Sequence, residues 1–121
     1  MFSHARILIV DSSAESRDVL RTLLERLGAE TIEAAQTRHA SGLARHARPH
    51  VIVFDAESDD DPSAEAVDDL GRAASRSSTP IVVLGTQRQC LSPLATGHFV
   101  SKPYHYATLI RRIEVLLGNR A

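Results

Sequence analysis

Short runs of branched apolar residues, separated by longer amphipathic stretches, constrain the fold of this chain more than any other feature. Three of these runs are too short for a helix and rich in β-branched residues, which is typical of strands buried on both faces of a sheet. A fourth run alternates polar and apolar residues and predicts an edge strand, and a fifth, less regular run is a further candidate. In chain order the predicted strands are residues 6–10, 29–34, 51–54, 81–84 and 97–101.

Helical patterns follow four of these strands, with apolar residues recurring at three- and four-residue spacing. The first stripe ends at Gly28 and the second at Pro49, residue types that commonly terminate helices. For the third, Asp61 is the predicted N-cap and Pro62 the first helical residue. The stripes are Val19, Leu20, Leu23, Leu24 and Leu27; Ala40, Leu43, Ala44 and Ala47; Ala66, Val67, Leu70 and Ala74; and Leu109, Ile110, Ile113, Leu116 and Leu117, ended by Gly118.

Alternating strands and helices predict right-handed crossovers and a parallel sheet with helices on both faces. For five units in 121 residues we expect one domain, residues 1–121, of the α/β class with a flavodoxin-like doubly wound sheet of order 2-1-3-4-5. The segment between the fourth and fifth strands is short and contains Pro93 and Gly97, so its helix is predicted to span a turn or two at most. Ligands of such sheets gather outside the carboxyl ends of the strands, here between the first and third strands.

The distribution of charge argues against several classes of partner. Thirteen arginines and one lysine are scattered among fifteen acids and the net charge is −1, so we expect neither nucleic acid nor an anionic membrane as the main partner. Cys90 is the only cysteine, which excludes an intramolecular disulfide. No run approaches the roughly 20 apolar residues of a membrane span and no secretory leader is recognisable, so we expect a cytoplasmic protein.

Three charged residues lie just after predicted strands. Asp11 follows the first strand, Asp55 the third and Lys102 the fifth. Because the carboxyl ends of parallel strands meet at one edge of a sheet, we expect these side chains at one site. Two neighbouring carboxylates favour a cation, and Mg²⁺ typically takes one or two carboxylates while it keeps several waters. An aspartate can also attack phosphorus to form an acyl phosphate, and a lysine can hold the transferred phosphoryl oxygen.

The same residues carry a resemblance to a known family. The stretch "ILIVD", with Arg17 six residues after its aspartate, is followed by "VIVFD", "TPIVVL" and "FVSKP" in the order found in receiver domains of two-component response regulators. The chain resembles a CheY-like receiver domain over essentially its whole length. This resemblance implies a phosphorelay protein rather than an enzyme. Its implied partners are a histidine kinase or phosphotransfer protein and a downstream protein, with no direct contact to nucleic acid or membrane.

The resemblance also implies roles for individual residues. Asp55 would be the phosphoacceptor, Asp11 an acid that binds Mg²⁺, and Lys102 the lysine that contacts the phosphoryl group. Phe99 falls at the aromatic switch position of the fifth strand. The bond between Lys102 and Pro103 matches a family position that is often cis.

Two positions depart from the family pattern. Ser12 stands where the family has a second acid, so Mg²⁺ is expected to bind more weakly, and Glu57 lies near enough to Asp55 to help replace that acid. Gly85 stands where the family has a hydroxyl residue at the end of the fourth strand. Thr86 could supply this switch hydroxyl only if a bulge or loop re-aims it, because a one-residue offset turns a side chain to the other face.

The serines after Asp11 also have a structural interpretation. The sequence "SSAE" fits a capping box, with Ser12 as N-cap of the first helix and Glu15 reaching back, while Ser13 with Ser16 is the alternative register. Asp11 itself could serve only to stabilise the start of that helix.

Three functions therefore stand as hypotheses. The first is a phosphorelay receiver, and the second is a receiver-fold interaction module that no longer uses phosphate. The third is a flavodoxin-like enzyme or cofactor binder. It is disfavoured because the sequence has no G-x-G-x-x-G motif and no P-loop to hold a cofactor phosphate.

Overall fold

The computed structural model describes residues 2–55, 63–86 and 98–118 of the chain. Within these ranges the strands form one parallel sheet, which confirms the predicted order 2-1-3-4-5. The strands are β1 (Arg6–Val10), β2 (Glu30–Ala34), β3 (Val51–Asp55), β4 (Ile81–Gly85) and β5 (His98–Ser101). The helices are α1 (Ala14–Arg26), α2 (Thr37–Ala47), α3 (Ala64–Arg76) and α4 (Tyr106–Gly118).

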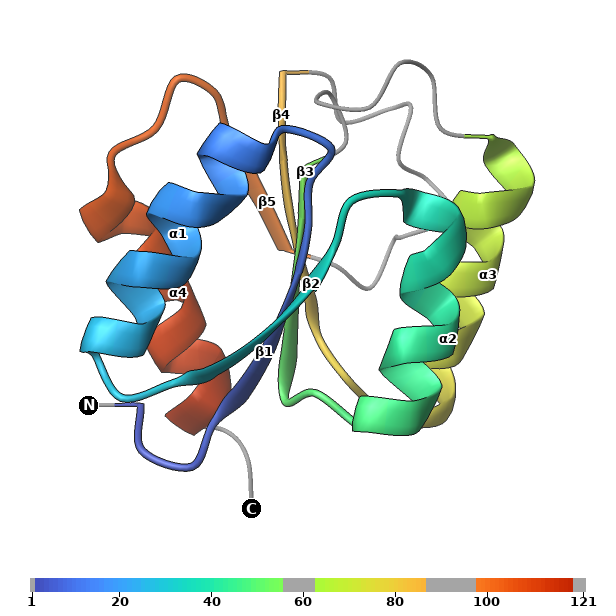
Figure 1. Ribbon diagram of the computed structural model, residues 1–121, viewed down its shortest axis with the longest axis horizontal. Helices are drawn as coiled ribbons and strands as arrows, with labels where there is room; N and C mark the ends of the chain where they lie inside the picture. Colours follow the sequence, from blue (N-terminus) through green and yellow to red (C-terminus); the bar gives the residue numbers. More distant parts are fainter. Residues whose placement is uncertain (1, 56–62, 87–97, 119–121) are drawn as a thin grey trace.

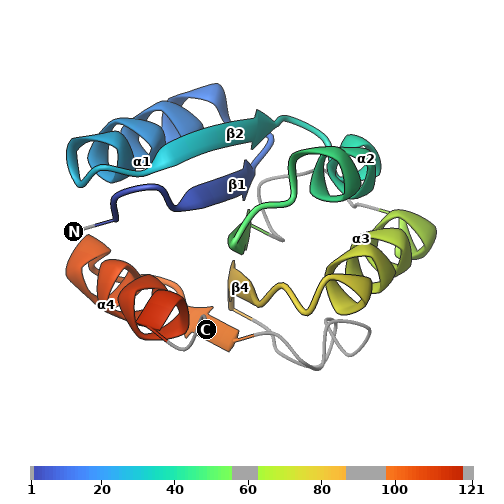
Figure 2. The same ribbon diagram turned by 90° about the horizontal axis from the view of Figure 1, so that it is seen from below.

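Helices cover both faces of the sheet. α1 and α4 lie on one face, and α2 and α3 lie on the other (Figures 1 and 2). Consecutive side chains of a strand point to opposite faces, so β1 places Ile7 and Ile9 on the α1/α4 side and Leu8 and Val10 on the α2/α3 side. All four are buried. Burial on both faces explains why the central strands are unbroken apolar runs in the sequence.

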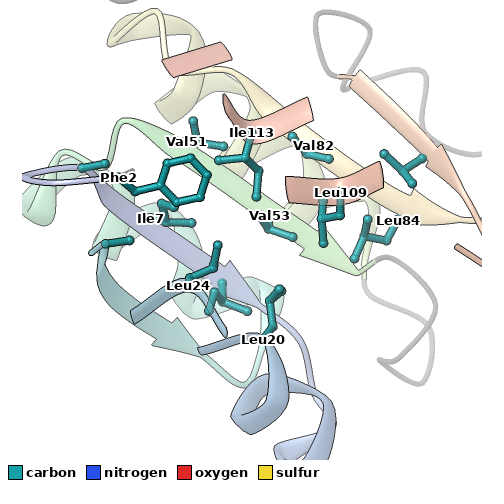
Figure 3. Packing of buried hydrophobic residues seen from close by; sticks show 14 residues of the cluster. Phe2, Ile7, Leu20, Leu24, Val51, Val53, Val82, Leu84, Leu109 and Ile113 are labelled. Carbon is teal, nitrogen blue, oxygen red and sulfur yellow. The ribbon is translucent and has the colours of Figure 1, made fainter. Parts of the chain in front are cut away.

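Each face of the sheet has its own core. On the α1/α4 side, aliphatic side chains from β1, β3, β4, α1 and α4 pack together with Phe2 (Figure 3). On the α2/α3 side, Phe54 and Leu70 are fully buried, and most of the surrounding helical residues are alanines. The two cores differ in the size of the side chains that the helices supply, and α1 and α2 show this difference most clearly.

The start of α1 corrects one prediction. Ser13 is the N-cap, and its hydroxyl accepts a hydrogen bond from Ser16 N at 3.2 Å. The predicted cap Ser12 is therefore wrong, and the alternative register is confirmed. The physical reason lies one residue earlier, because Asp11 Oδ1 accepts a hydrogen bond from Ser13 N at 2.9 Å. This side-chain turn carries the chain past Ser12 before the helix begins.

The start of α3 corrects a second prediction. The helix begins at Ala64, and the Ser63 hydroxyl accepts a hydrogen bond from Ala66 N at 3.1 Å. Ser63 rather than Asp61 is therefore the N-cap, and Ala64 rather than Pro62 is the first helical residue. Serine and aspartate are comparable N-caps, so residue preference alone could not separate the two registers.

Two further expectations concern larger parts of the chain. The short helix predicted between the fourth and fifth strands falls at residues 87–97, which lie outside the described residues, as does Cys90. Among the described residues, no helix combines the length and the apolar character needed to cross a bilayer.

Candidate functional site

Two buried carboxylates lie at the carboxyl ends of neighbouring strands. β1 and β3 pair in parallel, with Val10 opposite Phe54, so Asp11 and Asp55 each follow the last residues of this pairing. Asp11 is 3% exposed and Asp55 is 6% exposed. Ionised carboxylates are almost never buried this deeply unless they are paired or hydrogen-bonded. Their partners therefore indicate what the site can do.

Lys102 is the partner of Asp55. Its Nζ donates to both carboxylate oxygens, at 2.8 Å each. The backbone holds this lysine in place, because Lys102 N donates to Gly85 O at 3.0 Å, just beyond the pairing of Gly85 with Ser101. The peptide bond between Lys102 and Pro103 is cis. The pairing of β4 with β5 therefore places Lys102, which follows β5, so that its amine reaches Asp55 at the end of β3.

Asp11 is held by contacts to two neighbouring elements, β2 and α1. Its N–H donates to Ala34 O at 3.0 Å, and its carbonyl accepts a hydrogen bond from Arg17 Nη1 at 2.7 Å. Arg17 Nε also donates to Glu33 Oε1 at 3.2 Å, so the guanidinium joins the β1–α1 loop to the edge strand β2. Because Asp11 Oδ1 already accepts from Ser13 N, the carboxylate shapes the start of α1 as well as facing the carboxyl end of the sheet. The structural and the functional interpretation of Asp11 are therefore compatible.

Tyr104 adds an aromatic group to this end of the sheet. Its ring packs against the α1/α4 core and makes an edge-to-face contact with Tyr106, with ring centroids 5.8 Å apart. Burial raises the pKa of Tyr104 to about 12, helped by Tyr106 and by the negative charges of Asp55 and Asp11. The Tyr104 phenol is therefore neutral at pH values well below 12. Both carboxylates lie close enough to influence its pKa. The sequence patterns did not single out Tyr104, although its place two residues after Lys102 was a usable signal.

Of the other predicted site residues, Thr86 and Phe99 are among those that the structure describes. Gly85 is buried at the end of β4, and Thr86 is exposed immediately after it. Phe99 pairs with Val83 in the register of β5 and packs partly buried against the α2/α3 core. Glu57 lies outside the described residues. The roles of Thr86 and Phe99 in a switch stay predictions.

The donor set can be compared with what a cation needs. Among the described residues, no three histidine, cysteine or acidic side chains are grouped to hold a metal. Asp11 and Asp55 remain as a pair of carboxylates, and Ser12 stands where a third acid would add charge. Since Mg²⁺ is commonly bound by one or two carboxylates and completes its shell with water, this pair fits a weakly held Mg²⁺.

Comparisons with known proteins agree with the geometry. A family model described as "Flagellar regulatory protein FleQ" matches residues 6–114. The protein PilH of Pseudomonas aeruginosa is 27% identical over 120 residues, with 95% of this chain and 99% of PilH covered. The phosphate regulon transcriptional regulatory protein PhoB of the same organism is 28% identical over 116 residues. The alignment covers 92% of this chain but spans about half of PhoB, 51% of its length.

Solved structures show the same architecture. The chemotaxis protein CheY4 of Vibrio cholerae superposes with a TM-score of 0.77 at 26% identity, covering 93% of this chain and 98% of CheY4. A LuxR-family two-component response regulator from Aurantimonas sp. gives a TM-score of 0.76 at 28% identity, covering 98% of this chain and 89% of its own. The receiver domain of the Francisella response regulator 1452 gives 0.80 at 20% identity, over 98% of this chain and all of that one, and supports the fold alone. The chain belongs to the family of the flagellar regulatory protein FleQ, and it is a receiver domain of the response regulator type.

Proposed function

We propose that residues 1–121 form one receiver domain that accepts a phosphoryl group on Asp55 from a histidine kinase or a phosphotransfer protein. The observation that supports this most is the contact of Lys102 Nζ with both oxygens of Asp55 at the end of β3. A downstream protein would read the result, and the protein would act in the cytoplasm together with its phosphodonor.

The chemistry follows from the positions of two side chains. An Asp55 oxygen forms a bond to phosphorus while the phosphorus–nitrogen bond of a partner's phosphohistidine breaks, and the freed imidazole nitrogen keeps the electron pair and takes up a proton. Lys102 loses one carboxylate oxygen as a partner and gains a phosphoryl oxygen in its place. Little reorganisation is needed, because the bond to Gly85 fixes the backbone of Lys102 and its ammonium already lies against Asp55.

Mg²⁺ would be held by Asp11 and Asp55, with Glu57 as a further candidate ligand. The cation supplies charge neutralisation at the transferring phosphoryl group. Asp11 is prepared for this by its backbone bonds to Ala34 and Arg17, which fix the loop that carries it. With Ser12 in place of a second acid, we expect binding to be weak.

Phosphorylation can be measured directly. The protein is incubated with Mg²⁺ and a small phosphodonor, and its intact mass is followed; in parallel, beryllofluoride is added and amide spectra are recorded. We expect one phosphoryl group per chain and shifts around Asp55 and Lys102. Asp55→Asn should abolish both, while Asp68→Asn, the same change at an exposed position of α3, should alter neither. No mass increase and no shift at millimolar Mg²⁺ would exclude Asp55 as the acceptor.

An interaction module that does not use phosphate is the second candidate. Two observations favour it: Ser12 removes an acid from the cation site, and Gly85 removes the hydroxyl at the end of β4. In addition, the charge of Asp55 is already balanced within the chain by Lys102. An unphosphorylated protein whose Asp55→Asn variant binds its downstream partner unchanged would support this candidate. For the flavodoxin-like enzyme or cofactor binder, the described residues offer no supporting observation.

A further inference from the structure

The outward face of α2 is entirely basic. The exposed residues of this helix are Arg38, His39, Arg45 and His46, and Gly42 lies among them. With 3.6 residues per turn, these five positions form one continuous arc of about 120° with Gly42 in its centre. The opposite side of the helix buries small side chains against the sheet. These residues therefore form one continuous surface of α2 and are not distributed around the helix.

These charges are not balanced inside the protein. Within residues 2–55, 63–86 and 98–118, neither Arg38 nor Arg45 forms an ion pair, and Arg38 Nε instead donates to the side chain of Gln36 at 2.8 Å. The sequence has no acidic residue between Glu33 and Asp55. On α3, by contrast, the exposed Arg72 pairs with Asp69. α2 thus presents charge that the fold itself does not use.

Several local features of α2 also lower the stability of the folded chain. The N-cap position, Gln36, makes no capping side-chain hydrogen bond, and Arg38 and His39 lie in the first turn, near the positive end of the helix dipole. Gly42 in a helix interior costs about 0.5–1 kcal/mol relative to alanine. Beyond the adjoining backbone of α2, a Cβ built at Gly42 would meet no described atom within 4 Å, so no packing against these residues requires a glycine. Such violations of local rules are expected where a surface has another function.

We propose that this face of α2 is a docking surface for an acidic helix of a protein partner, which crosses α2 at Gly42. Arg38 and Arg45 lie two turns apart, about 10 Å along the axis, so carboxylates two turns apart on the partner can reach both. Arginine binds carboxylates in a bidentate geometry. The missing side chain at Gly42 lets the two helix axes approach at the short end of the usual range of about 8–10 Å.

Two other occupants fit less well. A second copy of this chain would have to offer two free acids two turns apart on one helix. Within the described helices only Asp18 and Glu25 have that spacing, and both pair with Arg21. Duplex DNA is typically held by about 6–10 phosphate contacts. α2 and its end offer three arginines, the third being Arg48, on a chain of net charge −1. The inferred contact is independent of phosphorylation at Asp55.

The test uses a synthetic helical peptide as the probe. It is alanine-based, about 20 residues long so that it is helical in water, and carries glutamates on one face at two-turn spacing; a matched peptide carries glutamines. Amide spectra of the labelled protein should shift at residues 36–48 with the glutamate peptide only. The dissociation constant should rise at least about tenfold in the double variant Arg38→Glu with Arg45→Glu. The matched control, Arg76→Glu with Arg111→Glu, makes the same charge change on α3 and α4 and should bind as the wild type does.

A substitution at Gly42 tests the close approach separately. Gly42→Gln adds a long side chain where there is open space, so it should fold at least as stably as the wild type and yet weaken binding about tenfold. Gly42→Ala should weaken it less. The proposal is overturned if both charge-reversal variants bind alike, if Gly42→Gln binds unchanged, or if the shifts lie outside α2. It is also overturned if a short DNA duplex or anionic lipid vesicles shift α2 while the glutamate peptide does not.

Discussion

α1 and α2 both contact the edge strand β2, from opposite faces of the sheet, and they are built differently. α1 buries Leu20 and Leu24, whereas α2 buries Ala40 and Ala44. The inward face of α1 is thus built from large apolar side chains and that of α2 from small ones.

The outward faces of the two helices differ as well. On α1, Arg21 pairs with Asp18 and Glu25 within the helix and with Glu33 on β2. The hydrogen bond that Arg21 donates to Asp18 is the main cause of the raised pKa of Arg21. α2 forms no ion pair with any described residue. The charges of α1 therefore serve the fold and the loop that bears Asp11. Those of α2 are left for a contact outside the chain.

The largest expected difference between the helices is in their cores. Leu24→Ala should lower the free energy of unfolding by about 2–5 kcal/mol, because a fully buried leucine leaves a cavity. Ala44→Gly on α2 should cost only about 1 kcal/mol, since it removes one methyl group and some helix propensity. Urea unfolding followed by circular dichroism measures both. Equal losses in the free energy of unfolding would show that the two buried side chains stabilise the fold to the same extent.

A matched pair of arginine substitutions compares the outward faces. Arg17→Gln should lower the free energy of unfolding by about 1–3 kcal/mol, because the carbonyl of Asp11 loses its charged donor. Arg45→Gln should change it by less than about 0.5 kcal/mol, as expected of an exposed side chain that forms no ion pair with any described residue. The amide signal of Ser13, which is bonded to Asp11, should move only in the first variant. A shift there in Arg45→Gln would contradict the assignment of separate roles.

Two glycines give opposite predictions. Gly42→Ala should raise the free energy of unfolding by about 0.5–1 kcal/mol, because it lies in a helix and its Cβ has open space. Gly28→Ala, at the end of α1, should lower it by roughly 1–2 kcal/mol, because its φ of +100° is a left-handed conformation. The new Cβ would also lie 3.4 Å from Ser3 N. Thermal unfolding of the two variants decides the sign, and a destabilised Gly42→Ala would point to a structural need for that glycine.

The smallest effect is expected from the surface ion pairs of α1. Asp18→Asn should cost about 0–1 kcal/mol at low salt, since an exposed pair contributes little and is screened. The difference should vanish in 1 M salt. Arg38→Gln on α2 should be neutral or slightly stabilising, because it removes a positive charge near the positive end of a helix. A salt-dependent loss of stability in Arg38→Gln would reveal an internal partner for this arginine.

Much of the fold could be predicted because burial on both faces leaves a clear pattern. The central strands were found because β1, β3 and β4 cannot carry polar side chains on either face. Helix starts were less predictable. Ser12 and Ser13 both satisfy a capping pattern, and the choice depends on the Asp11 side chain, which turns back to Ser13 N. A contact of that kind cannot be read from residue preference.

The candidate site was predictable in its position and not in its surroundings. Sheet topology alone places Asp11, Asp55 and Lys102 at one edge, because parallel strands end together. The electrostatic coupling of Tyr104 to the carboxylates depends on how the ring packs, which no spacing rule describes. The basic face of α2 was missed for another reason. Net charge is a sum over the whole chain, in which fourteen basic residues nearly cancel fifteen acids. The sum therefore does not reveal that the arginines of α2 form no ion pair with any described residue.

Lys102 has a consequence for experiment because it is the only lysine in the sequence. An amine-selective acylating reagent has a single side-chain target in this protein, and that target is 28% exposed and held against Asp55. Lys102 can therefore report on its own contact with Asp55 without an engineered label. The rate at which Lys102 is acylated measures how tightly its ammonium is held by Asp55, and any event that separates the two becomes visible as a change in labelling.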